Sequence, residues 1–310
     1  MTSRFGPVSD ARVEAPQLRP LGVGDIVDRV FALYRARPAL YLAVSAVPYL
    51  LFVLVTIGAG IVLVTGTAGL TDLVNVLAQG DVPDPALFAN VTVSFLGFVL
   101  FLILAAIVIL SSQTAALVYA MSSRYLGRPV TLNDAFRAGL RASPRVIGTG
   151  LLLFLAVILL WVLLVAIMVI SRQAFVAAGL VFFGTVATFY LFASTLVAPV
   201  VATIESVGPL AAIRRSWSLS QGHRWRIVGL QLLLLVLNGV ISALISAIFV
   251  STLIADAGLR TAAQQITNAA TTIAWAPVEW GTFAILYYDL RVRREAFDLQ
   301  LAAEALPREP

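Results

Sequence analysis

The acidic residue best placed for chemistry is Glu279, which interrupts the apolar stretch AWAPVEWGTFAILYYDL. It lies ten residues before Asp289, which is about 15 Å along a helix and therefore near mid-membrane. A carboxylate at that depth is costly and is by default a hypothesis for proton coupling or transport. Pro277, two residues earlier, loosens the helix and frees a carbonyl to accept a hydrogen bond from the carboxyl group. Two structural roles remain open. Glu279 is protonated and bonded to a neighbouring helix, or its helix is displaced toward the interface, where the flanking Trp275 and Trp280 are favourable.

The other acidic residues offer one further possibility, a divalent metal ion bound where the apolar segments end. The carboxylates suited to such a site are Asp28, Asp134, Glu205 and Asp289. Their spacing matches no ligand pattern, the chain has no cysteine, and its one histidine, His223, lacks partners for a metal site. The sequence also has no phosphate-binding glycine loop and no nucleophile motif. We therefore expect no catalytic residue, no cofactor and no metal site, and a lipid-modifying enzyme is kept only as a second alternative.

Arginine side chains supply a different chemistry, the binding of anions. All 21 basic residues are arginine. Three stretches, 24–37, 131–141 and 208–220, place arginines on the polar side of a predicted amphipathic helix. Such helices lie in the headgroup plane, where each arginine near an anionic leaflet contributes about 1 kcal/mol. The alternative is that they only cover the ends of the bundle. The residues expected to contact anionic lipid or a partner are Arg29, Arg35, Arg137, Arg141, Arg214, Arg215, Arg291, Arg293 and Arg294.

Membrane-spanning helices must position these residues. Of 310 residues, 60% are hydrophobic and 12% are charged, about half the charged fraction of a soluble domain. Six continuous apolar runs are long enough to cross a bilayer as helices, and none alternates like a barrel strand. We predict an all-α integral membrane domain over residues 21–300 with short cytoplasmic amphipathic interfacial helices. Its six transmembrane helices are predicted at 39–64, 92–119, 147–170, 174–203, 227–255 and 266–288. Residues 1–20 are expected to be a disordered cytoplasmic segment and 301–310 a cytoplasmic tail.

The distribution of arginine predicts the orientation of these spans. Nineteen of the 21 arginines fall before the first span, after the second and fourth spans, or after the sixth. Only Arg172 and Arg260 fall on the other side. This bias predicts a multi-pass protein of the cell (inner/plasma) membrane with both termini in the cytoplasm. The first 38 residues contain no signal-peptide hydrophobic region. Topology accounts for the positive charge, so we expect no nucleic-acid partner.

Intramembrane polar and small residues point to contacts between helices. Gln113, Gln231 and Asn238 are expected to join helices through hydrogen bonds. In the fifth span, small residues recur at every fourth position: Gly239, Ala243, Ala247 and Ser251. We interpret this ridge as packing within the chain, and contact with a second copy or another membrane protein is the alternative.

Three stretches carry a resemblance to a bacterial family. They are LRPLGVGDIVDRVFALYRARP, ESVGPLAAIRRSWSLSQGHRWR and LYYDLRVRREAFDLQ. Over residues 18–300 the chain resembles actinobacterial-type multi-pass proteins of the "glycerophosphoryl diester phosphodiesterase membrane domain" family. The resemblance implies a six-span helical domain of poorly defined function. It does not carry over hydrolysis, because the catalytic (β/α)₈ barrel needs about 250 residues of alternating strand and helix, a pattern that this chain lacks.

These features predict a non-enzymatic inner-membrane protein, a scaffold or accessory subunit. Its arginine-rich helices would hold anionic lipid of the cytoplasmic leaflet or another membrane protein. The alternative is a small transporter or lipid-handling protein that uses Glu279. The alternative needs a water-accessible cavity that reaches Glu279.

Overall fold

The computed structural model describes residues 20–67, 69–248, 257–297 and 300. These residues are almost entirely helical and contain no strand, which confirms the predicted all-α class. The helices are α1 Val23–Ala36, α2 Pro38–Gly66, α3 Leu70–Ala78, α4 Pro85–Tyr125, α5 Leu132–Ser171, α6 Ala174–Thr195, α7 Ala198–Ile204, α8 Pro209–Ser220, α9 Arg224–Ser246 and α10 Ala257–Glu295. The predicted disordered segment 1–20, except its last residue, and the predicted tail 301–310 lie outside the described residues.

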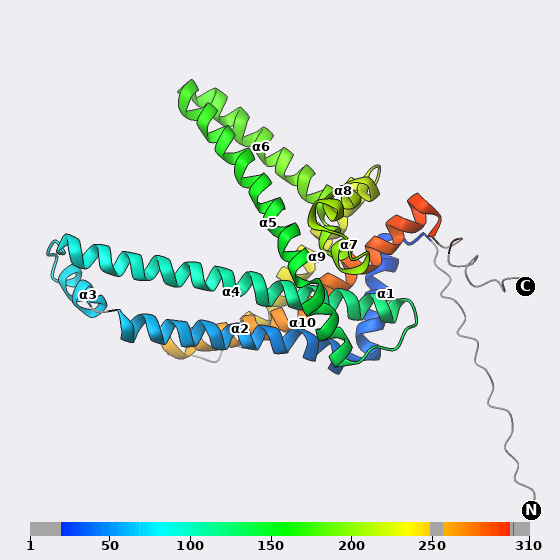
Figure 1. Ribbon diagram of the computed structural model, residues 1–310, viewed down its shortest axis with the longest axis horizontal. Helices are drawn as coiled ribbons and strands as arrows, with labels where there is room; N and C mark the ends of the chain where they lie inside the picture. Colours follow the sequence, from blue (N-terminus) through cyan, green and yellow to red (C-terminus); the bar gives the residue numbers. More distant parts are fainter. Residues whose placement is uncertain (1–19, 68, 249–256, 298–299, 301–310) are drawn as a thin grey trace, which may run out of the picture.

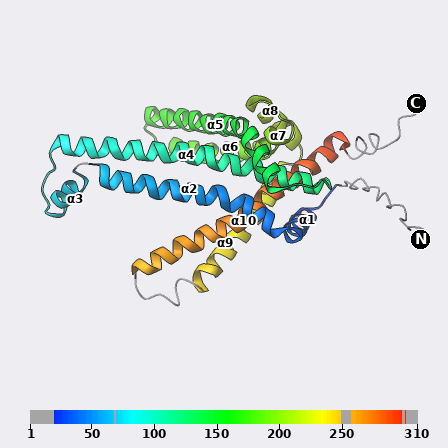
Figure 2. The same cartoon turned by 60° about the horizontal axis from the view of Figure 1, so that its bottom comes forward.

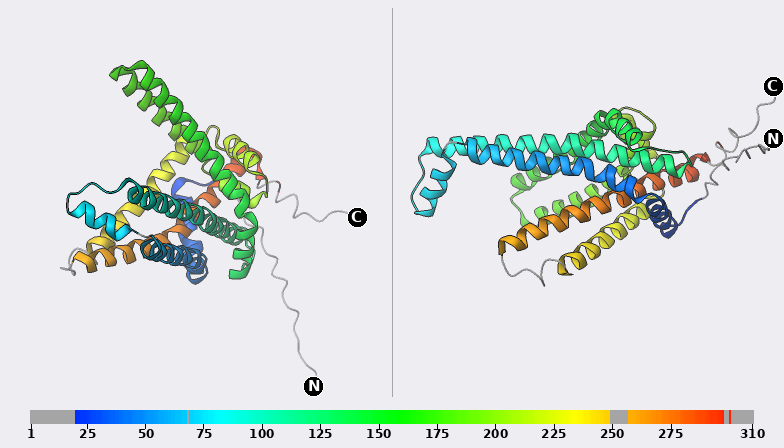
Figure 3. Two further views of the ribbon diagram at one scale, coloured as in Figure 1. Left: turned by 60° about the vertical axis from the view of Figure 1, so that its left-hand side comes forward. Right: turned by 90° about the horizontal axis from the view of Figure 1, so that it is seen from below.

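The long helices form three hairpins that diverge from one end of the molecule (Figure 1). Helices α2 and α4, with α3 at the tip, form the first hairpin, α5 and α6 the second, and α9 and α10 the third. Figures 2 and 3 show that the third hairpin also leans away from the first. We call the end where the hairpins meet the polar end, because α1, α7, α8 and the arginine-rich end of α10 lie there.

All three stretches predicted to be short amphipathic helices are helical, but the middle one is not a separate element. Helices α1 and α8 are distinct, whereas residues 132–141 form the first turns of α5. Thr131 caps this helix. Its hydroxyl accepts a hydrogen bond from the backbone N–H of Asp134 (3.2 Å), and the Asp134 carboxylate accepts one from the Thr131 N–H (3.1 Å). The first turn of α5 is therefore stabilised by this cap, and the helix continues without a break into the apolar run.

Within the described residues, five helices are long and apolar enough to cross a membrane: Pro38–Gly66, Pro85–Tyr125, Leu132–Ser171, Phe175–Ile204 and Arg224–Ser246. They contain the first three predicted spans, all but the first residue of the fourth, and residues 227–246 of the fifth. The fourth is divided between α6 and α7. Pro199, in the first turn of α7, has no N–H to offer to the Thr195 carbonyl, so the α-helix is interrupted there.

The sixth predicted span behaves differently. Residues 266–288 lie inside the continuous helix α10, but this helix is not apolar enough to be counted with the other five. The physical reason is a polar face that lines a pocket shared with α9, made of Asn268, Thr271, Thr272 and Glu279. Composition alone therefore supports five spans and does not establish the sixth.

The apolar surfaces of the spans face outward. The most apolar stretches of α4 and α5 bury none of their residues within the protein. Large side chains such as Phe101, Leu155 and Phe183 are half or more exposed. A soluble protein does not expose continuous apolar surface on this scale, whereas helices with internally bonded backbones are stable in lipid. The fold is that of a membrane protein.

The packed core is concentrated at the polar end. Ile26 and Val30 of α1, Val200 of α7 and Leu286 of α10 are fully buried there. Helices α1 and α8 pack on this core, so the predicted amphipathic helices do cover the end of the bundle.

Helices α4 and α5 approach closely at Gly139. A Cβ atom at this position would lie 2.7 Å from the carbonyl oxygen of Ser112 and 2.8 Å from the Cβ of Ala116. One turn along, the hydroxyl groups of Ser112 and Ser143 are 3.0 Å apart. Glycine therefore permits the crossing that brings the two helices together.

Polar contacts join the first two spans as predicted. The amide of Gln113 on α4 donates to the carbonyl and hydroxyl oxygens of Ser45 on α2, each at 3.0 Å. The interpretation of the small-residue ridge as packing within the chain stays a prediction. Gly239, Ala243 and Ala247 are exposed, and a Cβ at Gly239 would meet no atom within 4 Å. Ser251 lies outside the described residues. A contact with a second copy or another membrane protein stays a prediction.

Candidate functional site: an arginine-lined pocket

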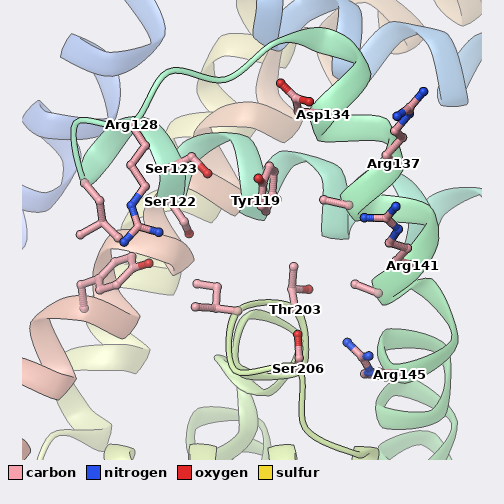
Figure 4. A pocket seen from close by; sticks show the side chains of 15 residues that line it. Tyr119, Ser122, Ser123, Arg128, Asp134, Arg137, Arg141, Arg145, Thr203 and Ser206 are labelled. Atoms are coloured by element: carbon pink, nitrogen blue, oxygen red, sulfur yellow. The ribbon is translucent and has the colours of Figure 1, made fainter.

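A pocket of about 430 Å³ lies at the polar end between α4, α5 and α7 (Figure 4). Its wall on α5 carries Arg137, Arg141 and Arg145, which are four residues apart and therefore share one helix face. Arg128, from the connection between α4 and α5, lies on the opposite side. Four guanidinium groups thus surround one cavity.

Hydroxyl groups line the rest of the pocket: Tyr119, Ser122 and Ser123 of α4, Thr203 of α7, Ser206 and Tyr288. Ser122 is only 5% exposed. Its Oγ lies near the Tyr288 phenol but has no hydrogen bond of acceptable geometry within the described chain. Leaving a buried hydroxyl unbonded costs about 1–3 kcal/mol. A ligand oxygen in the pocket would relieve that cost.

The pocket is strongly positive because its described lining carries four arginines and a single acid, Asp134. Asp134 accepts hydrogen bonds from the backbone N–H of Thr131 (3.1 Å) and from its hydroxyl (2.6 Å). In the part of the chain that the structure describes, none of the four pocket arginines forms an ion pair. Guanidinium forks match the oxygens of phosphate and bind it bidentately. The arrangement is suited to a phosphate-bearing anion.

Three of the seven other arginines predicted to contact lipid or a partner form ion pairs within the protein. Asp289 is 1% exposed and forms ion pairs with Arg226 and with Arg293, the second at 3.0 Å. The backbone N–H of Leu21 donates to Asp289 at 2.7 Å, and Arg293 donates to the Leu21 carbonyl at 2.8 Å. We call this set the Asp289 clamp. It joins the segment before α1 to α9 and α10.

A second network joins α7, α8 and α10. Arg215 pairs with Glu205 at 3.0 Å and also with Glu295. Arg291 pairs with Glu295 at 3.0 Å. The hydroxyl of Tyr287 donates to Glu205 at 2.8 Å. Arg215, Arg291 and Arg293, which were expected to contact anionic lipid or a partner, thus form ion pairs within the protein, and a contact with lipid or a partner stays a prediction for them.

The remaining predicted arginines have separate surroundings. Arg294 donates to the carbonyl of Ser218 and the side chain of Gln221. Arg35 donates to the Phe31 carbonyl, and Arg29 lies 5.9 Å from the ring centre of Tyr125. Arg214 is exposed.

Of the nine arginines predicted to contact lipid or a partner, only Arg137 and Arg141 line the pocket. Arg128, Arg145 and Ser122 were not predicted, although the spacing of 137, 141 and 145 is visible in the sequence.

The carboxylates considered for a metal site do not gather. Glu205 and Asp289 belong to the two separate arginine networks described above. Among the described residues, no group of three or more histidine, cysteine, aspartate and glutamate side chains lies close enough to hold a metal ion.

The second network predicts a response to acid. Burial acts to raise the pKa of Glu295, but hydrogen bonds from Arg215 and Arg291 outweigh it, and the net pKa is lowered. A lowered pKa in the folded state contributes stability above the unfolded value, near 4.3, and that stability is lost as the pH falls through the folded value. Because the group still contacts solvent, we expect a contribution of about 1 kcal/mol or less at pH 7.

Thermal unfolding of detergent-solubilised protein from pH 7 to 3 measures this effect. The Glu295→Gln variant should melt slightly below the wild type at pH 7, and the gap should close below about pH 4. A gap that widens in acid would contradict the assignment.

Glu279 lies beside a second pocket, of about 230 Å³, between α9 and α10. Gln231 on α9 lies beside its carboxyl group, and the predicted role of Gln231 in joining helices stays a prediction. Trp275 is 8% exposed, and Trp280 packs edge-on against Phe283. These tryptophans are thus packed inside the protein and do not mark a membrane interface.

A family model described as "Domain of unknown function (DUF8558)" matches residues 19–278. No curated protein and no solved structure matches the chain. The likeness to the glycerophosphoryl diester phosphodiesterase membrane domain stays a prediction.

Proposed function

Because the chain belongs to the DUF8558 family, a family of unknown function, we propose a function from its site: it is a membrane protein that binds the phosphate of an anionic lipid at the polar end. In this proposal it acts as a scaffold or accessory subunit and catalyses no reaction itself. The observation that carries the proposal is a pocket lined by four arginines, none of which forms an ion pair within the described residues, and by the buried hydroxyl of Ser122.

The depth of the pocket supports a lipid ligand. Arg145 immediately precedes the apolar run 147–170, so the pocket would lie at the level of the headgroups. Leu140, between the pocket arginines on α5, is 66% exposed. Apolar surface beside the guanidinium groups would contact acyl chains while the phosphate occupies the pocket.

The orientation follows from the same charges. We infer that α10 is the sixth span, that the polar end faces the cytoplasm, and that both termini are cytoplasmic. The arginine bias supports this arrangement, and anionic lipid of the cytoplasmic leaflet would be within reach of the pocket.

Removing two pocket arginines tests the proposal. We expect Arg141→Gln/Arg145→Gln to weaken binding of phosphatidylglycerol by roughly 100-fold or more, since each of the two charge-assisted hydrogen bonds contributes about 1.5 kcal/mol or more. Binding is measured as the rise in melting temperature when phosphatidylglycerol is added to the delipidated protein in detergent. The matched control is Arg37→Gln, an exposed arginine outside the pocket, which should behave like the wild type.

Two further ligands, tested in the same assay, show whether the bound phosphate belongs to a lipid headgroup or to a soluble anion. Phosphatidylcholine should give little stabilisation, and inorganic phosphate should compete only at much higher concentration. If inorganic phosphate binds as tightly as the lipid, a soluble anion is the ligand. Equal lipid binding by the double variant and the wild type would refute the proposal.

A further inference from the structure

A second site, separate from the arginine pocket, lies within the third hairpin. The 230 Å³ pocket is lined by Asn238, Ser242, Asn268, Thr271, Thr272, Trp275, Ala276 and Glu279. Glu279 is ten residues and Asn268 twenty-one residues before Asp289 on one continuous helix. The pocket therefore spans heights of about 15 to 31 Å above the polar end, far from the four guanidinium groups.

The lining favours a positive ligand. Among the described residues that line it, Glu279 is the only charged one, and the other polar members are amides and hydroxyls. The hydroxyl proton of Thr271 is already donated to the Thr267 carbonyl (2.9 Å), and that of Ser242 to the Asn238 side chain (3.3 Å). Both hydroxyl oxygens are thus left as acceptors.

A further acceptor lies beside the carboxyl group. The Oε1 atom of Gln231, a residue beside Glu279, is buried and has no hydrogen-bond partner within the described chain. A donor placed between Gln231 and Glu279 would satisfy both. No arginine lines the pocket to supply it.

The size and the aromatic wall select the class of cation. A cavity of 230 Å³ is several times the roughly 30 Å³ that one water molecule occupies in the liquid, and it is too large to enclose a bare metal ion. The indole of Trp275 forms part of the wall, and aromatic rings attract organic ammonium ions. We propose that this pocket binds a small organic ammonium ion, with Glu279 as its counter-ion and the amide and hydroxyl oxygens as acceptors.

Tryptophan fluorescence of the full chain in nonionic detergent tests the proposal, because Trp275 lines the pocket. Ethylammonium chloride, titrated at constant ionic strength against sodium chloride, should give a saturable change in emission. We expect Trp275→Phe to remove most of this signal. Glu279→Gln, which keeps the shape of the side chain, should weaken the apparent affinity at least tenfold. The matched control is Asp72→Asn, an exposed acid on α3, which should bind like the wild type.

A second variant keeps the proposal testable in case Glu279→Gln does not fold. Asn238→Leu removes an acceptor on α9 and should also weaken binding, and gel filtration should show both variants to be monodisperse. A change that does not saturate, or equal affinity in Glu279→Gln and the wild type, would overturn the proposal. Equal competition by sodium would overturn the assignment to an organic cation. None of these outcomes depends on the arginine pocket, so each site can fail independently.

Discussion

Replacing Asp289 with asparagine is expected to lower the free energy of unfolding by about 3–5 kcal/mol. The carboxylate is buried and is shared by Arg226, Arg293 and the backbone N–H of Leu21. Its loss leaves two partly buried guanidinium groups without their counter-charge, and removing one member of a buried pair costs more than the pair itself contributes. Denaturation in mixed micelles with increasing dodecyl sulfate measures the change.

A charge-matched control separates this effect from a change in net charge. Asp28→Asn, at an exposed position on α1, should change stability by no more than about 0.5 kcal/mol. The double variant Asp289→Asn/Arg226→Gln should recover part of the loss, because it removes one of the stranded charges. If Asp289→Asn is as stable as Asp28→Asn, the clamp does not stabilise the fold.

Replacing Gly139 with leucine should destabilise the protein by about 3 kcal/mol, at the upper end of the usual cost of overpacking. The new Cβ would lie 2.7 Å from a backbone oxygen of Ser112, and backbone atoms cannot rotate away. Helix α5 must therefore move from α4. Since Arg137 and Arg141 lie on α5 and Ser122 on α4, binding of phosphatidylglycerol should weaken as well.

Gly150 provides the control on the same helix. A Cβ there would meet no atom within 4 Å, and leucine favours helix by up to about 1 kcal/mol over glycine. Gly150→Leu should therefore be neutral or slightly stabilising in the same assay. Equal stability of the two leucine variants would show that the close approach at Gly139 is not required.

Local patterns in the sequence predicted the helices and their connections well. Apolar runs and caps such as Thr131 depend on residues a few positions apart, and the first five spans lie where the runs predict them. The sixth could not be identified by composition, because Asn268, Thr271 and Glu279 turn part of α10 toward a polar pocket.

The roles of individual arginines were predicted less well, and the reason is distance along the chain. Arg215 is matched by Glu295, 80 residues later, and Leu21 by Asp289, 268 residues later. A helical repeat relates residues three or four positions apart, so it cannot reveal pairs that are this far apart in the sequence. The repeat of Arg137, Arg141 and Arg145, by contrast, lies within one helix and indicated a basic face, although the opposing wall with Ser122 required the fold.

Contacts between the long helices also determine how the hairpins are connected to one another. If the three hairpins formed an open row, the first and the last would each contact only one neighbouring hairpin. Here α10 contacts α1, α2 and α4, while α4 contacts α5, and α6 contacts α9. The row is thereby joined into a ring, in which every hairpin has two neighbours. A repeat array can fray from its ends, but a ring has no terminal unit, so the loss of any one hairpin exposes both of the others.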